Sequence, residues 1–368
     1  MTADVLICGA SFAGLAVARE LAGCGASVLL IDRYHVGERA TSACAAPTQW
    51  LHALGVGDAI CKEIPHMTFT TPRGSVRYRL PWSWSAFDYR RLCQLLYAQS
   101  DANFHTATVR GLVEPDESMD GDCIVVMTDR GALRAPLVVD ALGWRRVLGS
   151  SGHQPPESPL SRGLEVHPEG GGEDLDVWIE RSLVRRGYGW RVPTNGEARV
   201  GVASYAPGDH VRKPTVALAE RLGLEAVRYQ GNWFPHRLRP ATENSIFFVG
   251  DSAGHCFPLS GEGIRTAFYF GIACGRELTA VLAQRRSRTE AIRRYGAFSA
   301  SHSRAFTLAS NLQRIIPALP PRLLMAGLRL LGHQRLIDRS FGWYLDQAHP
   351  SFARPRSTPE TSLPALPQ

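Results

Sequence analysis

Lysine is almost absent from this chain. Of its 41 basic residues only Lys62 and Lys213 are lysines, so arginine supplies nearly all of the positive side of a formal net charge of +7 at pH 7. The arginines are scattered and form no basic stripe interleaved with aromatic residues, as a nucleic-acid-binding surface would. A solvated, arginine-rich surface is the first interpretation, and an anionic substrate or lipid surface is the second. We expect no nucleic acid among the partners.

Long hydrophobic runs are also missing. Charged residues, glycine or proline interrupt every apolar stretch well before the roughly 20 residues that a membrane-spanning helix needs. The chain begins directly with the apolar segment Val5–Cys8, without the basic and then apolar layout of a signal peptide. These absences predict a cytoplasmic protein, with any membrane contact being peripheral.

The eight cysteines include no C-x-x-C pair. Several lie within apolar patterns, where cysteine acts as a small hydrophobic residue. We therefore expect reduced thiols, no disulfide framework and no metal site. At 368 residues the chain is long for a single ordinary core, which favours two interleaved lobes.

What the sequence does contain is a nucleotide-binding pattern at its start. Residues 4–9 have the pattern of a buried parallel strand, and a glycine turn, Gly9–Gly14, leads into a helix expected from Leu15 to Gly23. A second strand, Ser27–Ile31, ends at Asp32. A strand, glycine turn, helix and acid in this order are the dinucleotide-binding fingerprint in its proper context.

Each position of this pattern has a physical role. Gly9 allows the tight turn, Gly14 lets the helix pack close to the strand, and the helix N-terminus presents free N–H groups to a pyrophosphate. Asp32 stands where an acid should bind the adenosine ribose hydroxyls, and Ser11 replaces the middle glycine of the pattern. The predicted cofactor contacts in this segment are Gly9, Ser11, Phe12, Ala13, Gly14, Asp32 and Arg33.

A second candidate cofactor segment lies towards the other end of the chain. A buried-strand pattern, Ser245–Gly250, runs into Asp251, and a Pro258-x-x-Gly261-x-Gly263 turn precedes a helix expected from Ile264 to about Ala283. An acid after a strand can bind the polyol that links a flavin to its phosphates. The positive end of the helix can stabilise the anionic side of a reduced flavin. The predicted contacts are Asp251, Pro258, Gly261, Gly263 and Ile264.

This second segment resembles a known motif. Gly250–Gly254, Pro258, Gly261 and Gly263 are similar to the second FAD motif of the superfamily that contains para-hydroxybenzoate hydroxylase, geranylgeranyl reductase and flavin-dependent halogenases. The resemblance implies FAD as the cofactor. It also implies an α/β fold, in which a Rossmann-type FAD-binding domain carries an interleaved antiparallel β-sheet substrate domain and C-terminal helices.

The resemblance also divides the chain. It places the FAD-binding domain at residues 1–65, 86–150 and 240–300 and the substrate sheet at residues 66–85 and 151–239. A helical cap should follow at residues 301–354, with two helices over Phe306–Ala348 broken at Pro317 and Pro320–Pro321. The cap could cover the substrate cavity, pack into the core or touch a membrane. The Pro-, Ser- and Thr-rich tail, residues 355–368, should be disordered.

Two middle segments separate the branches of the superfamily. The segment Val138–Arg145 resembles the D-A-x-G-R form of reductases and halogenases, with Leu142 where aromatic hydroxylases carry an acid. The segment Gly187–Pro193 resembles the reductase substrate motif Y-x-W-x-F-P, although halogenases carry a similar W-x-W-x-I-P. Tyr188 and Trp190 fall on one face of a strand, where they could line an apolar wall or act as core aromatics. We take both as candidate catalytic-site residues.

Two further positions follow from the resemblance to geranylgeranyl reductases. Cys44 matches the cysteine of a C-G-G-x-L stretch beside the flavin ring, with alanines in place of its glycines. Its thiol could donate a proton to the substrate or could merely pack. Tyr89 stands where the family places an arginine over the FAD phosphates, so Arg90 or Arg91 would have to substitute for it; we take Arg91 as the candidate.

The resulting functional hypothesis is an FAD-dependent oxidoreductase that reduces carbon–carbon double bonds of a prenyl or other apolar substrate. An external electron donor, NAD(P)H or a reduced carrier, would re-reduce the flavin. The alternative is a flavin-dependent monooxygenase or halogenase acting on an aromatic or polyketide-like natural product. Halogenases use a lysine, and the only one in the N-terminal half, Lys62, has the context of a helix end. An FAD-bearing binding or redox-sensing protein is the non-enzymatic reading.

Overall fold

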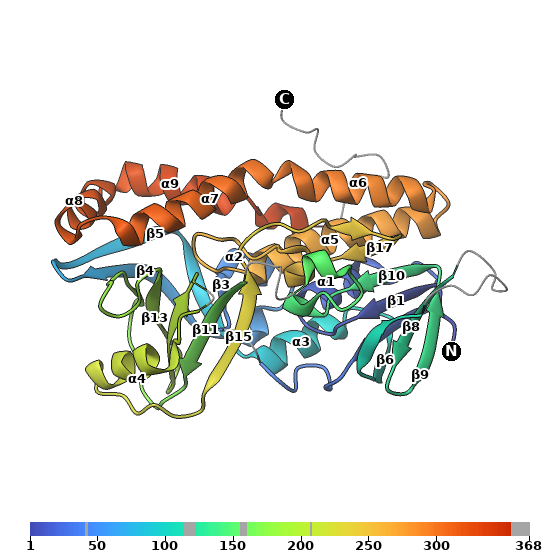
Figure 1. Ribbon diagram of the computed structural model, residues 1–368, viewed down its shortest axis with the longest axis horizontal. Helices are drawn as coiled ribbons and strands as arrows, with labels where there is room; N and C mark the ends of the chain where they lie inside the picture. Colours follow the sequence, from blue (N-terminus) through green and yellow to red (C-terminus); the bar gives the residue numbers. More distant parts are fainter. Residues whose placement is uncertain (41–42, 114–122, 155–159, 207, 355–368) are drawn as a thin grey trace.

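The computed structural model describes residues 1–40, 43–113, 123–154, 160–206 and 208–354. Within them the chain forms a parallel sheet and a larger, mostly antiparallel sheet, with C-terminal helices lying as a layer along one long side of both (Figure 1). The predicted α/β fold class is confirmed, including the Rossmann-type sheet, the interleaved antiparallel sheet and the helical layer. The predicted disordered tail, residues 355–368, lies outside the described residues.

The parallel sheet consists of short strands, most of them deeply buried. Its spatial order is β16 (Thr242–Glu243), β17 (Ile246–Phe248), β10 (Leu137–Asp140), β1 (Val5–Cys8), β2 (Val28–Asp32) and β6 (Asn103–Thr106), and only β16 is antiparallel to its neighbour. Strands β1 and β10 are buried along their whole length, as is typical of parallel strands covered on both faces.

Helices α1 (Phe12–Glu20) and α5 (Ile264–Leu282) pack closely together although they lie far apart in the sequence. A Cβ atom on Gly271 would lie 2.7 Å from the backbone oxygen of Ala13, and one on Gly250 would lie 2.9 Å from the Cβ of Ala13. Only residues without a side chain allow this approach. The contact brings the two predicted cofactor segments together.

The second sheet runs in the spatial order β15 (Gln230–Pro235), β11 (Leu160–Val166), β14 (Ala198–Ser204), β13 (Gly187–Pro193), β12 (Leu175–Trp178), β4 (Ile60–Thr71), β5 (Gly74–Phe87) and β3 (Ala45–Pro47). The hairpin of β4 and β5 extends on both sides of the predicted segment 66–85, and β3 comes from within the predicted FAD-binding segment 1–65.

Lys62 lies inside β4, where it pairs with Ala86 of β5. The predicted helix end at this lysine is wrong, because pairing with β5 across the hairpin sets the backbone conformation there.

The remaining elements are short. A small sheet contains β7 (Val109–Leu112), β8 (Ile124–Thr128) and β9 (Gly131–Ala135), and the helices α2 (Thr48–Ala53), α3 (Tyr89–Tyr97) and α4 (Arg212–Arg221) connect strands. Turns of 3-10 helix occur at Gly57–Ala59, Gly143–Arg145, Ser151–His153, Gly250–Ala253, Ile316–Ala318 and Pro350–Ala353.

The C-terminal layer consists of α6 (Arg288–Ser301), α7 (Ser303–Ile315), α8 (Pro321–Leu331) and α9 (Gln334–Asp346). The prediction of two helices over Phe306–Ala348 is wrong, because three occur. The extra break follows α8, where His333 takes an extended conformation with ψ of 125°. No helix in the described part of the chain combines the length and apolar character needed to cross a bilayer.

Candidate cofactor and substrate site

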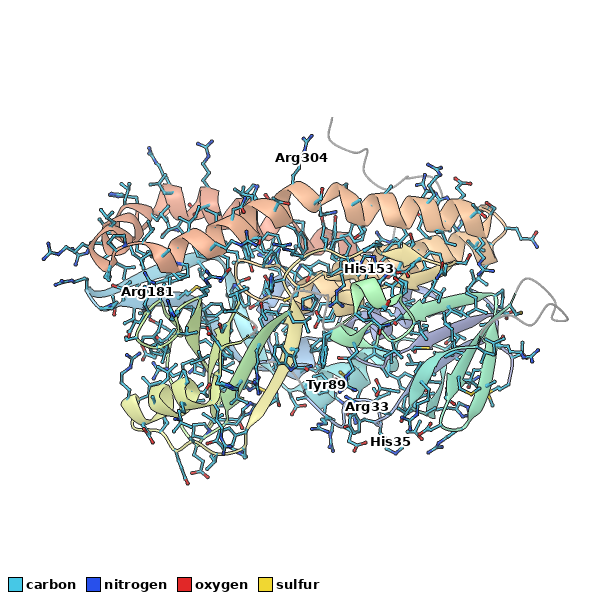
Figure 2. All side chains as sticks on the ribbon, in the orientation of Figure 1. Arg33, His35, Tyr89, His153, Arg181 and Arg304 are labelled. Atoms are coloured by element: carbon cyan, nitrogen blue, oxygen red, sulfur yellow. The ribbon has the colours of Figure 1, made fainter. Side chains whose placement is uncertain are left out.

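A large cavity lies between the two sheets and the C-terminal helices. Its volume is about 1280 Å³, and residues of α1, β2, α5, β13 and α8 are among those that line it. Arg33, His35 and Tyr89 belong to its wall beside the parallel sheet (Figure 2). Both predicted cofactor segments and the predicted substrate strand therefore face one continuous space.

The turn before α1 requires glycine at two positions. Gly9 has φ of +114°, and a Cβ atom there would lie 2.3 Å from the backbone oxygen of Ala141. A Cβ atom on Gly14 would lie 1.9 Å from the backbone oxygen of Gly9. Neither residue lines the cavity, whereas Ser11, Phe12 and Ala13 do. The two glycines shape the turn, and its exposed side faces the cavity.

Asp32 holds this turn in place. Its carboxylate accepts hydrogen bonds from the backbone N–H groups of Ala10, at 2.8 Å, and Tyr34, at 3.1 Å. Arg33 and Arg39 both stack on the Tyr34 ring, with guanidinium-to-centroid distances of 4.9 and 5.3 Å. All four side chains line the cavity. Tyr34 and Arg39 belong to no recognised motif, so sequence reasoning missed them.

The structure does not bring Arg91 to the cavity. Its guanidinium group lies 3.8 Å from the carboxylate of Asp58, and its side chain is 52% exposed. The cause is local, because Asp88 caps α3 by accepting a 2.7 Å hydrogen bond from the Arg91 N–H, and that helix directs Tyr89 inward instead. The Tyr89 hydroxyl donates to Ser11 Oγ at 3.1 Å. Arg33 and Arg39 are the arginines that line the cavity near the turn.

The second cofactor segment presents an acid to the cavity. Asp251 lines the wall, and its carboxyl group accepts no hydrogen bond from any described residue. Burial raises the pKa of Asp251 to about 6, against an opposing effect of the Arg239 charge. Gly261, Gly263 and Ile264 also line the wall, at the N-terminus of α5, whereas Pro258 is buried outside it. A buried carboxyl group that faces the cavity at this place fits a ligand that carries hydroxyl donors.

A buried network ties this segment to the C-terminal layer. Both guanidinium nitrogens Nε and Nη2 of Arg265 donate to the carboxylate of Glu262 at 2.9 Å, and Nη1 donates to the carbonyl of Leu345 at 2.6 Å. The Tyr344 hydroxyl donates to the same carboxylate. Helix α9 is therefore attached directly to the start of α5.

Asp140, in the segment that resembles D-A-x-G-R, is fully buried. It accepts hydrogen bonds from Ser252 Oγ at 2.6 Å and from the N–H groups of Leu142 and Leu148, each at 2.9 Å. The carboxylate thus joins β10 to the turn that carries Asp251. Leu142 itself lines the cavity.

Tyr188 and Trp190 both line the cavity from β13, with their ring centroids 5.9 Å apart. The Tyr188 hydroxyl donates to the carbonyl of Ser260, and burial raises the pKa of Tyr188. The indole N–H of Trp190 donates to Glu165 Oε2 at 3.2 Å. Both aromatic residues form part of the cavity wall, and the polar atom of each side chain is already hydrogen-bonded.

Cys44 is buried and is not among the residues that line the cavity, whereas its neighbours Ala43 and Ala45 are. Its backbone has φ of +50°, and its carbonyl accepts a hydrogen bond from Arg199 at 3.1 Å. Burial is the largest cause that raises the pKa of the Cys44 thiol. This position suits a packing residue better than a proton donor.

Glu165 is a wall residue that sequence reasoning missed. It is 3% exposed, lies on β11 and lines the cavity. The available signal was the alternation of β11, which places Glu165 and His167 on the same face of a mainly buried strand. Within the part of the chain that the structure describes, no group of three metal-ligating side chains occurs.

The far end of the cavity is apolar. It lies between β4, β5 and β12 on one side and the helices α7 to α9 on the other, and its walls include Phe69, Ile179, Leu319, Leu324, Leu328 and Phe341. Tyr78 of β5 donates a hydrogen bond to the carbonyl of Leu328 and so fixes α8 over the sheet.

Comparison of the sequence with protein-family models and with curated proteins finds no match. Solved structures do match. A geranylgeranyl bacteriochlorophyll reductase-like protein from Thermoplasma acidophilum has a TM-score of 0.81 at 15% identity, over 95% of this chain and 97% of that one. The fold is that of the flavoprotein superfamily named above.

Two other structures of this fold are named as a monooxygenase and as a brominase. PqsL from Pseudomonas aeruginosa, described as a probable FAD-dependent monooxygenase, has a TM-score of 0.66 at 15% identity, over 93% of this chain and 100% of that one. The flavin-dependent brominase Bmp2 has a TM-score of 0.62 at 14% identity, over 94% and 100%. The predicted superfamily resemblance is confirmed, and at these identities it concerns the fold.

Proposed function

We propose that this chain binds FAD in the cavity and reduces carbon–carbon double bonds of a prenyl or similarly apolar substrate. The observation that carries the proposal is that one cavity joins two nucleotide-binding segments to an apolar end under α8. When bound and reduced by an external donor, NAD(P)H or a reduced carrier, FAD supplies a hydride to a substrate held beside it.

The residues at the two segments suit the parts of FAD. The first-turn N–H groups of α1 would bind the pyrophosphate, with Arg33 and Arg39 supplying positive charge nearby. Asp32 would accept from the ribose hydroxyls. Asp251 would accept from the polyol hydroxyls, and the N-terminus of α5 would face the flavin ring.

The loop beside the proposed flavin ring is held from the substrate sheet. Arg199, which is buried, donates to the carbonyls of Ala43 and Cys44, at 2.9 and 3.1 Å, and to that of Phe87 at 3.2 Å. The loop and the wall formed by Tyr188 and Trp190 would therefore keep a fixed spacing. A fixed, apolar gap of this kind excludes water and orients a substrate.

Oxygen chemistry is the second candidate, and the likeness to PqsL and Bmp2 favours it. Against a halogenase, neither lysine lines the cavity, and the Lys62 ammonium donates to the carbonyl of Gly172. Against an aromatic hydroxylase, Leu142 occupies the position of that branch's acid.

Anaerobic stopped-flow spectroscopy tests the proposal. The FAD-loaded protein is reduced and mixed with geranylgeraniol or, as a polar control, with 4-hydroxybenzoate. Reoxidation of the flavin by geranylgeraniol without oxygen is the expected result. If the flavin is reoxidised only after oxygen is admitted, and the added compound is hydroxylated, the protein is a monooxygenase instead.

We also propose a cytoplasmic protein whose helical cap rests on an anionic lipid surface. Residues 301–354 contain seven arginines and two acids, and so carry +5 of the net charge of +7. Leu323, Leu330 and Leu331 of α8 are 61%, 62% and 41% exposed, and Leu323 and Leu331 also line the cavity. Arg304 projects outward from the same helical layer (Figure 2). Exposed leucines among arginines match an anionic bilayer and provide an entry for an apolar substrate.

A further inference from the structure

One carboxyl group in the cavity wall has no part in the proposed cofactor site and is hydrogen-bonded to no arginine among the described residues. Glu165 lies on β11 and is almost fully buried. Its Oε1 accepts from His167 Nε2 at 2.9 Å and from Gln230 Nε2 at 3.1 Å, and its Oε2 accepts from the Trp190 N–H at 3.2 Å.

The other acids of the wall have different partners. Glu262 is bonded to the guanidinium group of Arg265, and Asp32 accepts hydrogen bonds from two backbone N–H groups. Asp251 is the acid assigned above to the polyol of the proposed cofactor. For Glu165, the hydrogen-bonded partner that can carry a charge is His167, among the residues that the structure describes. A buried carboxylate that is paired only with an imidazole can exchange its proton with that partner.

A chain of ionisable groups leads from this pair to solvent. The other ring nitrogen of His167, Nδ1, lies 3.4 Å from Glu197 Oε1. The Glu197 side chain is 25% exposed and also contacts Arg199 at 3.2 Å and Arg228 at 3.3 Å. These two arginines, from β14 and from the segment before β15, are the fixed positive charges that face the pair.

We propose that Glu165 delivers a proton into the cavity and that His167 resupplies it from solvent. The proposal rests on the reductase function above. The π bond of the substrate breaks: one carbon takes the hydride that FAD chemistry supplies, and the other takes the proton of Glu165. The Glu165 carboxylate then takes a proton from the His167 imidazolium, which solvent reprotonates past Glu197.

The structure places the two other candidate donors less well. The Cys44 thiol belongs to a residue outside the cavity wall. The Tyr188 hydroxyl is occupied by the carbonyl of Ser260. Glu165 instead lies in the cavity wall and is hydrogen-bonded to Trp190, a residue of the predicted substrate motif.

The kinetic test compares Glu165→Gln with Glu169→Gln, which removes an exposed carboxyl group four residues further along the chain. FAD affinity and the rate of flavin reduction should stay within about twofold in both variants. Anaerobic flavin reoxidation by geranylgeraniol should fall at least about 100-fold in Glu165→Gln alone, the usual scale of a lost general acid. In wild type the rate of this reoxidation should decline as the pH rises, because a general acid must be protonated. The decline should be absent in Glu165→Gln, whereas loss of a merely structural residue would not remove it.

A second measurement needs neither cofactor nor substrate. In apo-protein with 15N-labelled histidine, the hydrogen bond to Glu165 should set the chemical shift of His167 Nε2. That signal should move in Glu165→Gln and stay in place in Glu169→Gln. An unmoved His167 Nε2 signal in Glu165→Gln would overturn the proton pair, as would undiminished reoxidation in that variant. If wild type reduces no prenyl probe, the reductase function fails, and the His167 signal alone decides whether the pair exists.

Discussion

At the scale of single residues, the candidate site depends on small changes of volume and charge. Gly9 and Gly14 were identified from sequence because the spacing of a nucleotide turn is local and repeats among unrelated proteins. Glu165 and Arg39 were missed because no local motif contains them. The prediction for Arg91 failed because the direction of a side chain around a helix depends on which residue caps the helix. A shift of the cap by one residue would turn a different side chain towards the cavity.

Substitution of Gly14 by valine should destabilise the protein and prevent cofactor binding. The new Cβ atom would lie 1.9 Å from the backbone oxygen of Gly9, so the turn would have to open. We expect a loss of at least about 3 kcal/mol in the free energy of unfolding, the upper range for overpacking. Gly342→Ala, on α9 with open space around it, is the control and should be neutral or slightly stabilising. Urea unfolding of both variants checks this, and an equal stability for the two would contradict it.

Asp251→Asn should stabilise the apo-protein at high pH while weakening FAD binding. The pKa of Asp251 is about 6 in the folded protein, above its ordinary 3.8. The contribution of this carboxyl group to folding stability is therefore fully present below pH 3.8 and is lost as the pH rises through 6. That loss is on the order of 3 kcal/mol. The variant should therefore melt above wild type at pH 8 and level with it near pH 4, whereas its FAD affinity should fall about tenfold or more, the loss of one charge-assisted hydrogen bond. Equal melting temperatures of wild type and Asp251→Asn at pH 8 would show that the ionised carboxylate does not destabilise the fold.

At the scale of elements, the local patterns were predictable and the long-range pairings were not. The strands and helix over Val5–Asp32 and the helix from Ile264 followed from burial patterns and glycine turns. The hairpin of β4 and β5 started earlier and ended later than residues 66–85, because its ends are fixed by pairing across strands. The break between α8 and α9 was missed because no proline marks it, unlike the break at Pro320–Pro321.

Helix α8 gives the element-scale prediction. Removing an apolar side chain and a charge from its outer face, as in the pair Leu330→Ser and Arg329→Gln, should weaken binding to vesicles that contain anionic phosphatidylglycerol. The fold should be unaffected, because Leu330 is 62% exposed. The affinity for these vesicles, measured by cosedimentation, should fall about fivefold or more, because each charge near an anionic surface contributes about 1 kcal/mol. Tyr229→Ser, a similar loss of exposed apolar surface on the other lobe, serves as the control.

Wild-type binding to neutral phosphatidylcholine vesicles should be weak, and salt should release the protein from anionic ones. A wild-type protein that ignores both kinds of vesicle but dimerises through α8 would show that a second copy, not lipid, covers this face.

At the scale of the whole molecule, the largest buried cluster among the described residues joins parts of both lobes and of the helical layer, while two smaller clusters lie beneath α4 and α8. One continuous cluster of buried side chains joins the parallel sheet, α5, the hairpin of β4 and β5 and α9. The buried group of Glu262, Arg265 and Tyr344 links the cofactor segment to the C-terminal layer. We therefore expect the described part of the chain to unfold in one cooperative transition.

Arg265→Met tests this link. It leaves the Glu262 carboxylate buried without its cation, which typically costs about 3–5 kcal/mol. The double variant Arg265→Met with Glu262→Leu should recover part of that loss, because no uncompensated charge remains. Differential scanning calorimetry should show one transition at a lower temperature in the single variant. Two separated transitions in wild type would contradict the shared core.

The central claim is that the two separated segments form one FAD site. Its most direct test is titration of the apo-protein with FAD, FMN and NAD, followed by flavin or tryptophan fluorescence. We expect one FAD bound per chain and much weaker binding of FMN and NAD, since FAD alone of the three carries both an adenosine ribose for Asp32 and a ribityl chain for Asp251. Binding of NAD or FMN as tight as that of FAD would contradict it.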